Sequence, residues 1–178
     1  MANFTVPSKE QVSEENQKSF TNLKGALGFV PNIYAYMAHS KTALKDYLAL
    51  SGRKSSLSIK EQEIVNLATS QLNGCQYCLG AHTMIAKNNG FSGEQVIEAR
   101  KGEASYDEKL NVLAQFTKEA VDNRGNVSEA SKDKFFEAGF TEENLVDVVM
   151  LIGDRTITNL MHNLAQFKVD FPAADPMD

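Results

Sequence analysis

Apolar residues along this chain recur mostly at intervals of three and four positions, the spacing of one face of an α-helix. Alternating apolar and polar runs rich in β-branched residues, which would predict strands, are absent from the sequence. Short polar breaks separate the apolar segments. The pattern therefore predicts an all-α protein with about seven or eight helices.

Helix ends are marked by side chains that satisfy unpaired backbone groups. Ser58, Ser92 and Ser105 each stand three positions before a Glu or Gln, the spacing of a capping box. Pro31 is expected to open a short helix, and Thr141 to open a long one. The predicted helix ends are "NNG" at 88–90, Gly102, "NRG" at 123–125 and Gly139.

The domain organisation is expected to be simple. The length suits one domain over residues 1–178, with its core motif at 58–90, and no low-complexity segment divides it. Residues 1–15 and the tail "VDFPAADPMD" are polar or proline-rich, so we expect loosely attached ends.

Composition excludes several classes of function. The formal net charge is -5 and no basic run occurs, which argues against nucleic-acid binding. No apolar stretch approaches the roughly 18 residues that span a membrane, and the start lacks the features of a secretory signal. We therefore expect a cytoplasmic protein, and in that reducing compartment a close cysteine pair is typical of catalysis or metal binding.

Both cysteines lie in "LNGCQYCLGAH", residues 72–82. Asn73 and Gly74 break one helix, so the next should begin near Cys75. That places Cys78 in its first turn, where the helix dipole favours a thiolate. His82 follows Cys78 by four positions and should share its inward face.

Glu63 shares the i, i+4 file of Ile59 and Leu67 on the preceding helix. It should lie in or beside the apolar face, although a solvated position at the margin fits the spacing too. The tight turn folds the two helices together, which could bring Glu63 toward the cysteines. There it could fix the tautomer of His82 or act as the outer base.

Other readings of the cysteine pair stay open at this point. Attachment of c-type haem needs a histidine directly after the second cysteine, where this chain has Leu79. A zinc site needs about four ligands. Cys75, Cys78 and His82 supply three, and no spacing selects a fourth. An inert buried pair is the remaining alternative.

The spacing E-x11-C-x2-C-x3-H resembles the signature of the alkylhydroperoxidase D-like branch of the carboxymuconolactone decarboxylase family. The peroxidase-related members of that branch are also similar in other segments, so the resemblance covers nearly the whole chain. These segments are "GFVPN" at 28–32, "YLALSG" at 47–52, "EIVNLATSQLNGCQYCLGAH" at 63–82 and "LAQFKVDFP" at 164–172.

The resemblance implies a compact multi-helix fold, thiol-dependent reduction of hydroperoxides and an external dithiol reductant. It implies neither a cofactor nor a metal. By the same resemblance, Cys78 attacks the peroxide, Cys75 resolves the sulfenic acid, and Glu63 and His82 relay protons. Tyr77 stands where the family prototype has a histidine, and a phenol cannot shuttle protons near neutral pH. The decarboxylase branch lacks the cysteine pair, which argues against decarboxylation here.

Position on the helix suggests different tasks for the two sulfurs. Cys75, nearest the helix end, should be the more exposed and should meet the reductant. Cys78 has His82 at i+4 and is assigned the attack on peroxide. His162 lies in a polar file with Arg155, Asn159 and Gln166, which we interpret as a solvated face or a subunit contact. A role beside the thiols is its alternative.

The helix from Thr141 carries two apolar files, more than one packing partner requires. They are Val146–Val149–Gly153–Ile157 and Val148–Ile152–Thr156–Leu160. With the resemblance, this predicts a homo-oligomer, a trimer or hexamer. The leading hypothesis is thus a thiol peroxidase. The alternative is a redox-sensing or binding protein whose CxxC oxidises without turnover, followed by a zinc-binding domain.

Overall fold

The computed structural model describes residues 4–177, and within them the chain is helical with no strand. The predicted all-α class is confirmed, but the described range holds nine α-helices, more than expected. Short helices such as 43–51 and 129–137 have too few turns to stand out as periodic patterns. The elements are η1 Lys9–Gln11, α1 Glu14–Leu27, α2 Asn32–Met37, α3 Ala43–Ser51, α4 Ile59–Leu72, α5 Gln76–Asn88, α6 Gly93–Lys101, α7 Glu108–Asp122, α8 Glu129–Glu137 and α9 Glu142–Ala165.

Most predicted helix starts coincide with caps in the structure. Ser58 and Ser92 form capping boxes, and Pro31 directly precedes α2. The start predicted at Ser105 is wrong, because α7 begins at Glu108 and Asp107 caps it by accepting from the Leu110 amide at 3.0 Å. Ser105 instead donates its amide and hydroxyl to the Glu98 carboxylate.

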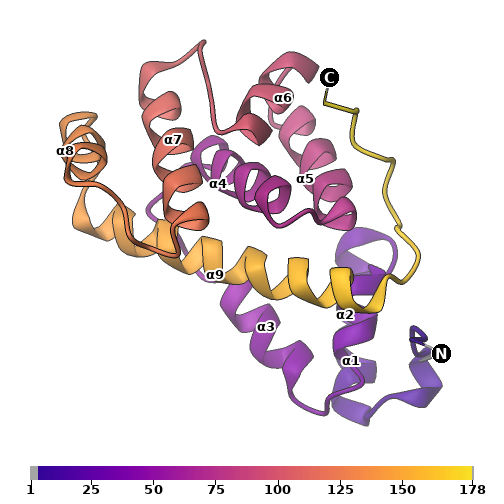
Figure 1. Cartoon of the computed structure of the whole chain (residues 1–178). Helices are drawn as coiled ribbons and strands as arrows, with labels where there is room; N and C mark the ends of the chain where they lie inside the picture. Colours follow the sequence, from indigo (N-terminus) through magenta and orange to yellow (C-terminus); the bar gives the residue numbers. More distant parts are fainter. Residues whose placement is uncertain (1–3, 178) are drawn as a thin grey trace.

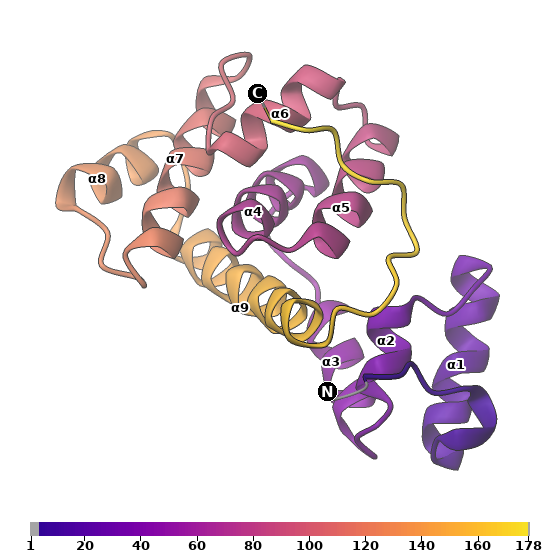
Figure 2. The same cartoon turned by 45° about the vertical axis from the view of Figure 1, so that its right-hand side comes forward.

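Helix α4 occupies the centre, with α5, α6, α7 and α9 packed around it (Figures 1 and 2). Helix α9 is the longest, 24 residues, and runs across the molecule from α8 to the α1–α3 group. Helices α1, α2 and α3 lie on the far side of α9 from α4. One helix therefore joins two regions of the fold.

The buried apolar residues form two clusters. The α4–α7 core contains Ile64, Leu67, Leu113, Phe135 and Val148 among others, from α4 and α6 to α9. The cysteine-side core brings together residues of α1, α2, α3, α5, the end of α9 and the tail. Its buried members are Phe20, Ile33, Ala35, Met37, Ala38, Leu44, Tyr47, Cys75, Tyr77, Cys78, Ala165 and Phe167.

Asp147 on α9 holds the loop between α3 and α4 in place. Its carboxylate accepts hydrogen bonds from the Ser56 amide and the Arg53 guanidinium, each at 2.5 Å. Hydroxyls of Ser55 and Ser56 add two further bonds. This anchor fixes where α4 begins and so fixes the register of the residues that α4 presents to α5.

The C-terminal tail is ordered on the protein, contrary to the expectation of a loose end. It runs beside α5 toward α6 (Figure 2). Asp170 accepts hydrogen bonds from the Tyr77 hydroxyl and the Asn32 amide, both at 2.6 Å. The tail crosses α5 at Gly80, where an added Cβ would lie 2.7 Å from the Pro172 carbonyl oxygen. The glycine therefore permits this close approach.

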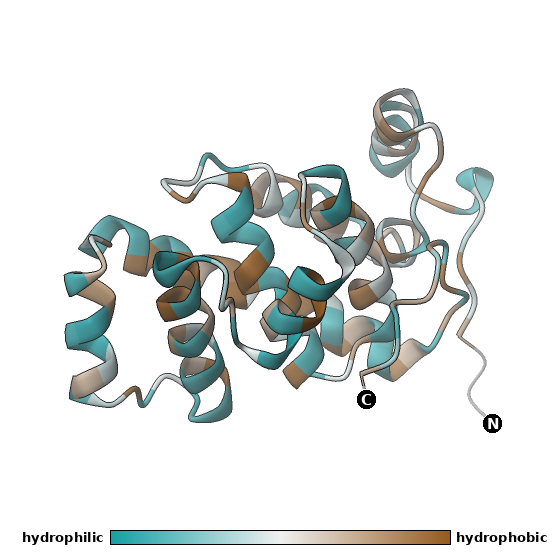
Figure 3. Ribbon diagram, turned by 90° about the horizontal axis from the view of Figure 1, so that it is seen from above, coloured by the Kyte–Doolittle hydropathy of each residue, from teal (hydrophilic) through white to brown (hydrophobic). Residues whose placement is uncertain are grey.

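At the other end of the chain, Val6 and Val12 pack against the cysteine-side core, so the described part of the N-terminal segment is also attached. Hydrophobic and hydrophilic residues alternate around the helices (Figure 3), as amphipathic packing requires. None of the helices in residues 4–177 combines the length and apolar character needed to cross a membrane.

Candidate active site

The two cysteines lie at the turn between α4 and α5. Gly74 adopts φ 66°, a left-handed conformation that lets the chain reverse within a few residues. Cys75 is the N-cap of α5, and its sulfur accepts a hydrogen bond from the Cys78 amide at 3.2 Å. The predicted helix start near Cys75, with Cys78 in the first turn, agrees with this geometry.

Both thiols are buried, Cys75 at 0% and Cys78 at 2% exposure. The expectation that Cys75 is the more exposed sulfur is therefore wrong. A residue at a helix end is exposed only if nothing packs over that end. Here Ala165 and Phe167, where α9 leads into the tail, belong to the same buried cluster as both cysteines.

Glu63 and His82 meet across the α4–α5 interface. The His82 Nδ1 atom lies 2.8 Å from one carboxylate oxygen of Glu63, and the Asn66 amide donates to the other oxygen at 2.9 Å. Glu63 is 4% exposed and His82 is 7% exposed. The carboxyl group therefore lies inside the apolar face, and the solvated position is excluded.

The other nitrogen of His82 contacts Arg155 of α9. The Arg155 Nη1 atom lies 2.6 Å from His82 Nε2, while Nη2 donates to the Tyr47 hydroxyl at 2.7 Å and to Asp154 at 2.9 Å. Neither Glu63 nor His82 forms a hydrogen bond with Cys78 in the described structure. The acid–imidazole pair thus contacts Arg155 and has no hydrogen bond to the thiol.

Polar groups of α9 surround the Cys78 sulfur. The sulfur lies 3.8 Å from the Thr158 hydroxyl. Asn159 is fully buried beside the cysteine turn, and its side-chain oxygen accepts a hydrogen bond from the Asn73 side-chain amide at 3.0 Å. A hydrogen bond with Cys75 lowers the pKa of Cys78, and a hydrogen bond from Asn159 and the charge of Arg155 lower it further. Burial raises the pKa of this thiol but does not cancel these effects. The same Cys75–Cys78 hydrogen bond, with burial, raises the pKa of Cys75.

Tyr77 and His162 lie together beside the pair. Their rings are 5.1 Å apart, and both contact Phe167. His162 is 7% exposed and bonds the Phe167 carbonyl oxygen at 3.0 Å, so its interpretation as part of a solvated face is wrong. These two side chains hold the tail against α5. His39 is exposed and lies just after α2, away from this pair.

Cys78 and His82 line a cavity of about 300 Å³ between α2, α3, α5, α9 and the tail. Arg155 and Tyr47 lie at its polar end, whereas Cys75 is not among its lining residues. The remaining walls are largely apolar and aromatic. They are Leu27, Phe29, Pro31, Ile33, Tyr34, Tyr77, Ala81, Met84, Ile85, Thr158 and Phe171.

Sequence reasoning missed Arg155, Tyr47, Thr158 and Asn159. The signal was present in "DRTITN", where polar residues recur at helical spacing inside an apolar helix. We interpreted that stripe as solvated. A polar stripe on a helix that is buried on several sides instead marks a polar site within the protein.

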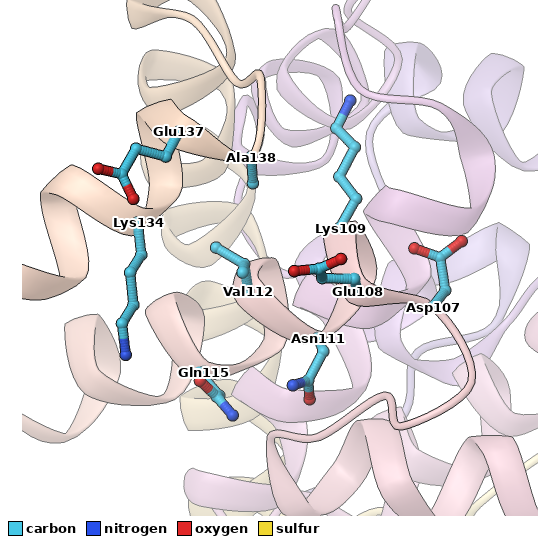
Figure 4. A pocket seen from close by; sticks show the side chains of 9 residues that line it. All are labelled: Asp107, Glu108, Lys109, Asn111, Val112, Gln115, Lys134, Glu137 and Ala138. Carbon is cyan, nitrogen blue, oxygen red and sulfur yellow. The ribbon is translucent and has the colours of Figure 1, made fainter.

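A larger hollow of about 770 Å³ lies between α7 and α8, away from the cysteines (Figures 1 and 4). Its lining side chains are mostly exposed and carry both signs of charge, for example Glu108 and Lys134. It contains no thiol or imidazole. The chemistry available to the protein therefore points to the smaller cavity.

No group of three or more His, Cys, Asp or Glu side chains in residues 4–177 is arranged to hold a metal ion. In particular, the Cys75 sulfur accepts from the Cys78 amide, the Cys78 sulfur lies near the Thr158 hydroxyl, and both ring nitrogens of His82 contact other side chains. Each side chain that could have served as a zinc ligand thus already has a protein partner.

The sequence profile of the carboxymuconolactone decarboxylase family matches residues 37–119, a range that includes Glu63, both cysteines and His82. An alkyl hydroperoxide reductase AhpD from Mycobacteroides abscessus is 44% identical over 41 residues, which is 23% of this chain and 23% of that protein. The resemblance inferred from the cysteine motif is confirmed.

Solved structures extend the likeness to the whole fold. A peroxidase-related protein from Ralstonia eutropha JMP134, described as an alkylhydroperoxidase AhpD core, superposes with a TM-score of 0.84 at 21% identity, covering 94% of this chain and 92% of that one. A peroxidase-related protein from Silicibacter sp. TM1040 gives 0.81 at 21% identity, covering 94% and 90%. The AhpD-like fold predicted from the sequence is therefore present.

A third solved structure is that of a protein named for a different activity. The debrominase Bmp8, as a cysteine-to-alanine variant bound to 2,3,4-tribromopyrrole, superposes with a TM-score of 0.77 at 15% identity, covering 96% of this chain and 92% of that one. At these identities the likeness concerns the fold. Solved proteins of this fold thus carry more than one named activity, so the fold alone does not identify a reaction.

Proposed function

We propose that this protein is a thiol peroxidase that reduces organic hydroperoxides with the Cys75–Cys78 pair. The observation that carries the proposal is the position of the two sulfurs. Cys78 lines an apolar cavity, and Cys75 lies behind it, outside the cavity lining and in hydrogen-bond contact. One sulfur is thus placed to meet a substrate and the other to resolve the product.

The proposed cycle balances with one added reductant. The Cys78 thiolate attacks the terminal oxygen of the hydroperoxide, so that an S–O bond forms, the O–O bond breaks and the alkoxide leaves as an alcohol after taking one proton. Cys75 loses its proton and attacks the Cys78 sulfenic acid, which releases water and forms the disulfide. An external dithiol returns two electrons and two protons and becomes a disulfide itself.

Because Cys75 is buried, the reductant is expected to contact the other sulfur, that of Cys78. Assigning reductant contact to Cys75 depended on exposure, and Cys75 has none. Cys78 is the sulfur that lines the cavity. We therefore propose that the reductant attacks the Cys78 sulfur of the disulfide through the cavity and leaves Cys75 as the thiolate.

Glu63 and His82 are proposed as the proton-exchanging pair. They are in contact and buried beside the cavity, which supports this role. The contact between His82 Nε2 and Arg155 limits it, because Nε2 must be released before it can exchange a proton with a substrate. Tyr77 and His162 are proposed to support the site through the tail rather than to transfer protons.

A redox sensor is the second candidate, and the burial of both thiols favours it. In this function, peroxide enters the cavity and oxidises Cys78, but no reductant follows it there, so oxidation occurs without turnover. In that case the disulfide would act as a stable signal.

A steady-state assay separates the two functions. The reduced protein is mixed with hydrogen peroxide, tert-butyl hydroperoxide or cumene hydroperoxide, and with monothiols, small dithiols and protein dithiols as reductants. We expect continuous consumption of peroxide with at least one dithiol. One equivalent consumed, followed by no turnover, supports the sensor. Absence of thiol oxidation contradicts both functions.

We also propose that the protein assembles as a homo-oligomer through α9. Six apolar side chains are exposed along this helix in the isolated chain, and they form a stripe on one face. They are Val146, Val149, Met150, Ile157, Leu160 and Leu164. Light scattering at micromolar concentration should give a multiple of 19.6 kDa, and a mass of one chain would contradict the proposal.

A further inference from the structure

Arg155 is a largely buried cation, with 12% of its side chain exposed. Three of its contacts go to side chains from three helices, His82 on α5, Tyr47 on α3 and Asp154 on α9 itself. Its Nε atom is buried and has no hydrogen-bond partner within residues 4–177. A buried donor without an acceptor is costly and calls for an explanation. Arg155 also lines the cavity that contains Cys78.

The contact with Arg155 fixes the protonation of His82. A guanidinium group has only donors, so His82 Nε2 must be the acceptor in their 2.6 Å contact. The proton of the neutral imidazole then lies on Nδ1, which donates it to Glu63. The lone pair of Nε2 is occupied, so in this arrangement His82 cannot take a proton from Cys78.

The charged groups around Arg155 leave it as the positive centre of the cavity. Asp154 and Glu63 are the nearby anions, and Glu63 is separated from Arg155 by His82. Burial raises the pKa of Tyr34 and of Tyr47, so both phenols are neutral. Arg155 is the one permanently charged side chain among the described residues that line the cavity.

We propose that Arg155 stabilises the negative charge that lies on the Cys78 sulfur before attack and on the leaving oxygen afterwards, and that Glu63, His82 and Tyr47 are positioning residues that hold the guanidinium there. This inference rests on the proposed peroxidase function. In that step His82 serves as an acceptor for Arg155, and the proton exchange proposed for Glu63 and His82 belongs to later steps, after His82 Nε2 is released.

The proposed step uses Arg155 without changing its protonation. As the Cys78 thiolate attacks, two electrons pass from sulfur to the peroxide, an S–O bond replaces the O–O bond, and negative charge moves to the leaving alkoxide. The guanidinium group lines the cavity, and a fixed donor in a dry site stabilises charge more than water does. The alkoxide then takes its proton from solvent that enters the cavity.

The test measures the thiolate of Cys78 independently of peroxide turnover. The rate at which iodoacetamide alkylates Cys78 is followed against pH by mass spectrometry. Arg155→Gln should raise the pH midpoint by about one unit or more, the effect expected for loss of a close opposite charge. It should also slow the single-turnover reaction with cumene hydroperoxide at least tenfold at pH 7. Arg155→Lys should recover part of the midpoint shift, because the charge is kept.

His82→Gln separates the two roles of the imidazole. Glutamine can still accept a hydrogen bond from Arg155 but cannot carry a proton. We expect its midpoint to stay near that of the wild type and its peroxide reaction to be slowed less than in Arg155→Gln. Arg53→Gln is the matched control, because Arg53 also pairs with an α9 carboxylate but not at the cavity. Its midpoint should be unchanged.

Several outcomes overturn the inference. An unchanged midpoint in folded Arg155→Gln would do so, as would a His82→Gln protein that loses as much activity as Arg155→Gln. If Arg155→Gln does not fold, Tyr47→Phe replaces it, because this variant removes the hydroxyl that accepts from Arg155. Tyr47→Phe should raise the pH midpoint of alkylation by less than Arg155→Gln would. The absence of a rise contradicts the proposal. The two proposals can also fail separately. If the wild type does not react with peroxide but Arg155→Gln still raises the pH midpoint of alkylation, the peroxidase function is refuted. The role of Arg155 in stabilising the Cys78 thiolate then stands.

Discussion

The α4–α7 core and the cysteine-side core differ in what they bury. In the α4–α7 core, Phe135 is fully buried and its ring lies 4.5 Å from the rings of both Phe116 and Phe140. Beside the cysteines, the protein buries the hydrogen-bonded pair of Glu63 and His82, and it buries Asn159 with separate hydrogen bonds. Apolar packing stabilises the fold, whereas burying polar groups costs free energy that only hydrogen bonds offset. The buried polar groups of the second region therefore depend on their hydrogen bonds, whereas the first region depends on apolar packing.

The largest expected effect is on reactivity at the cysteine side. Cys78→Ser should lose the rapid reaction with peroxide, because an alcohol is not ionised at neutral pH. Cys75→Ser should retain one stoichiometric reaction and accumulate a sulfenic acid on Cys78 that dimedone can trap. Stopped-flow kinetics and mass spectrometry measure both.

A reversed result would exchange the roles of the two sulfurs. That result is a sulfenic acid trapped on Cys75 in the Cys78→Ser protein, formed at a rate similar to the wild type. Both variants keep the volume of the side chain nearly unchanged, so a difference between them reports chemistry and not packing.

The next effect concerns stability of the α4–α7 core. Phe135→Ala should lower the free energy of unfolding by about 3–5 kcal/mol, through lost burial and the cavity left behind. Chemical denaturation measures the loss. The folded fraction should keep the peroxide reactivity of the wild type per thiol. A comparable loss of reactivity would show that the two regions are coupled more closely than their separate cores suggest.

The pH dependence of the peroxide reaction should separate Cys78 from an ordinary thiol. Hydrogen bonds from Cys75 and Asn159 and the charge of Arg155 lower the pKa of Cys78. The reaction should therefore stay fast below the ordinary thiol value of about 8.5 and slow only as pH falls through the lower pKa. A free-thiol peptide slows over a higher pH range. A profile that follows the peptide contradicts a stabilised thiolate.

The smallest expected effect tests the tail. Asp170→Asn weakens the bonds from the Tyr77 hydroxyl and the Asn32 amide and should cost about 1 kcal/mol of stability. Slow alkylation of Cys75 should become faster as the tail opens more often. Asp175→Asn is the control, because its ion pair with Lys87 joins two exposed side chains. Equal effects of the two variants would argue against a specific role of Asp170.

The sequence by itself determined the helical class, most helix ends and the residues that meet at the cysteine turn. These depend on local rules, namely the 3.6-residue period, capping side chains and the i, i+4 relation of Cys78 to His82. The short hairpin of the two helices on either side of the cysteine turn also made a contact between Glu63 and His82 possible, although the spacing fitted a solvated Glu63 too. Such features need only neighbours in the chain, so they can be read without the fold.

Only the tertiary structure decided which polar residues are buried and what they contact. Arg155 lies 73 positions from His82, and Asp170 lies 93 from Tyr77. A periodic pattern shows that residues share a face of a helix but not what covers that face. The burial of Cys75 under the end of α9 and the tail, and the arginine beside Cys78, depend on packing between distant segments, which hydrophobic spacing along one helix does not encode.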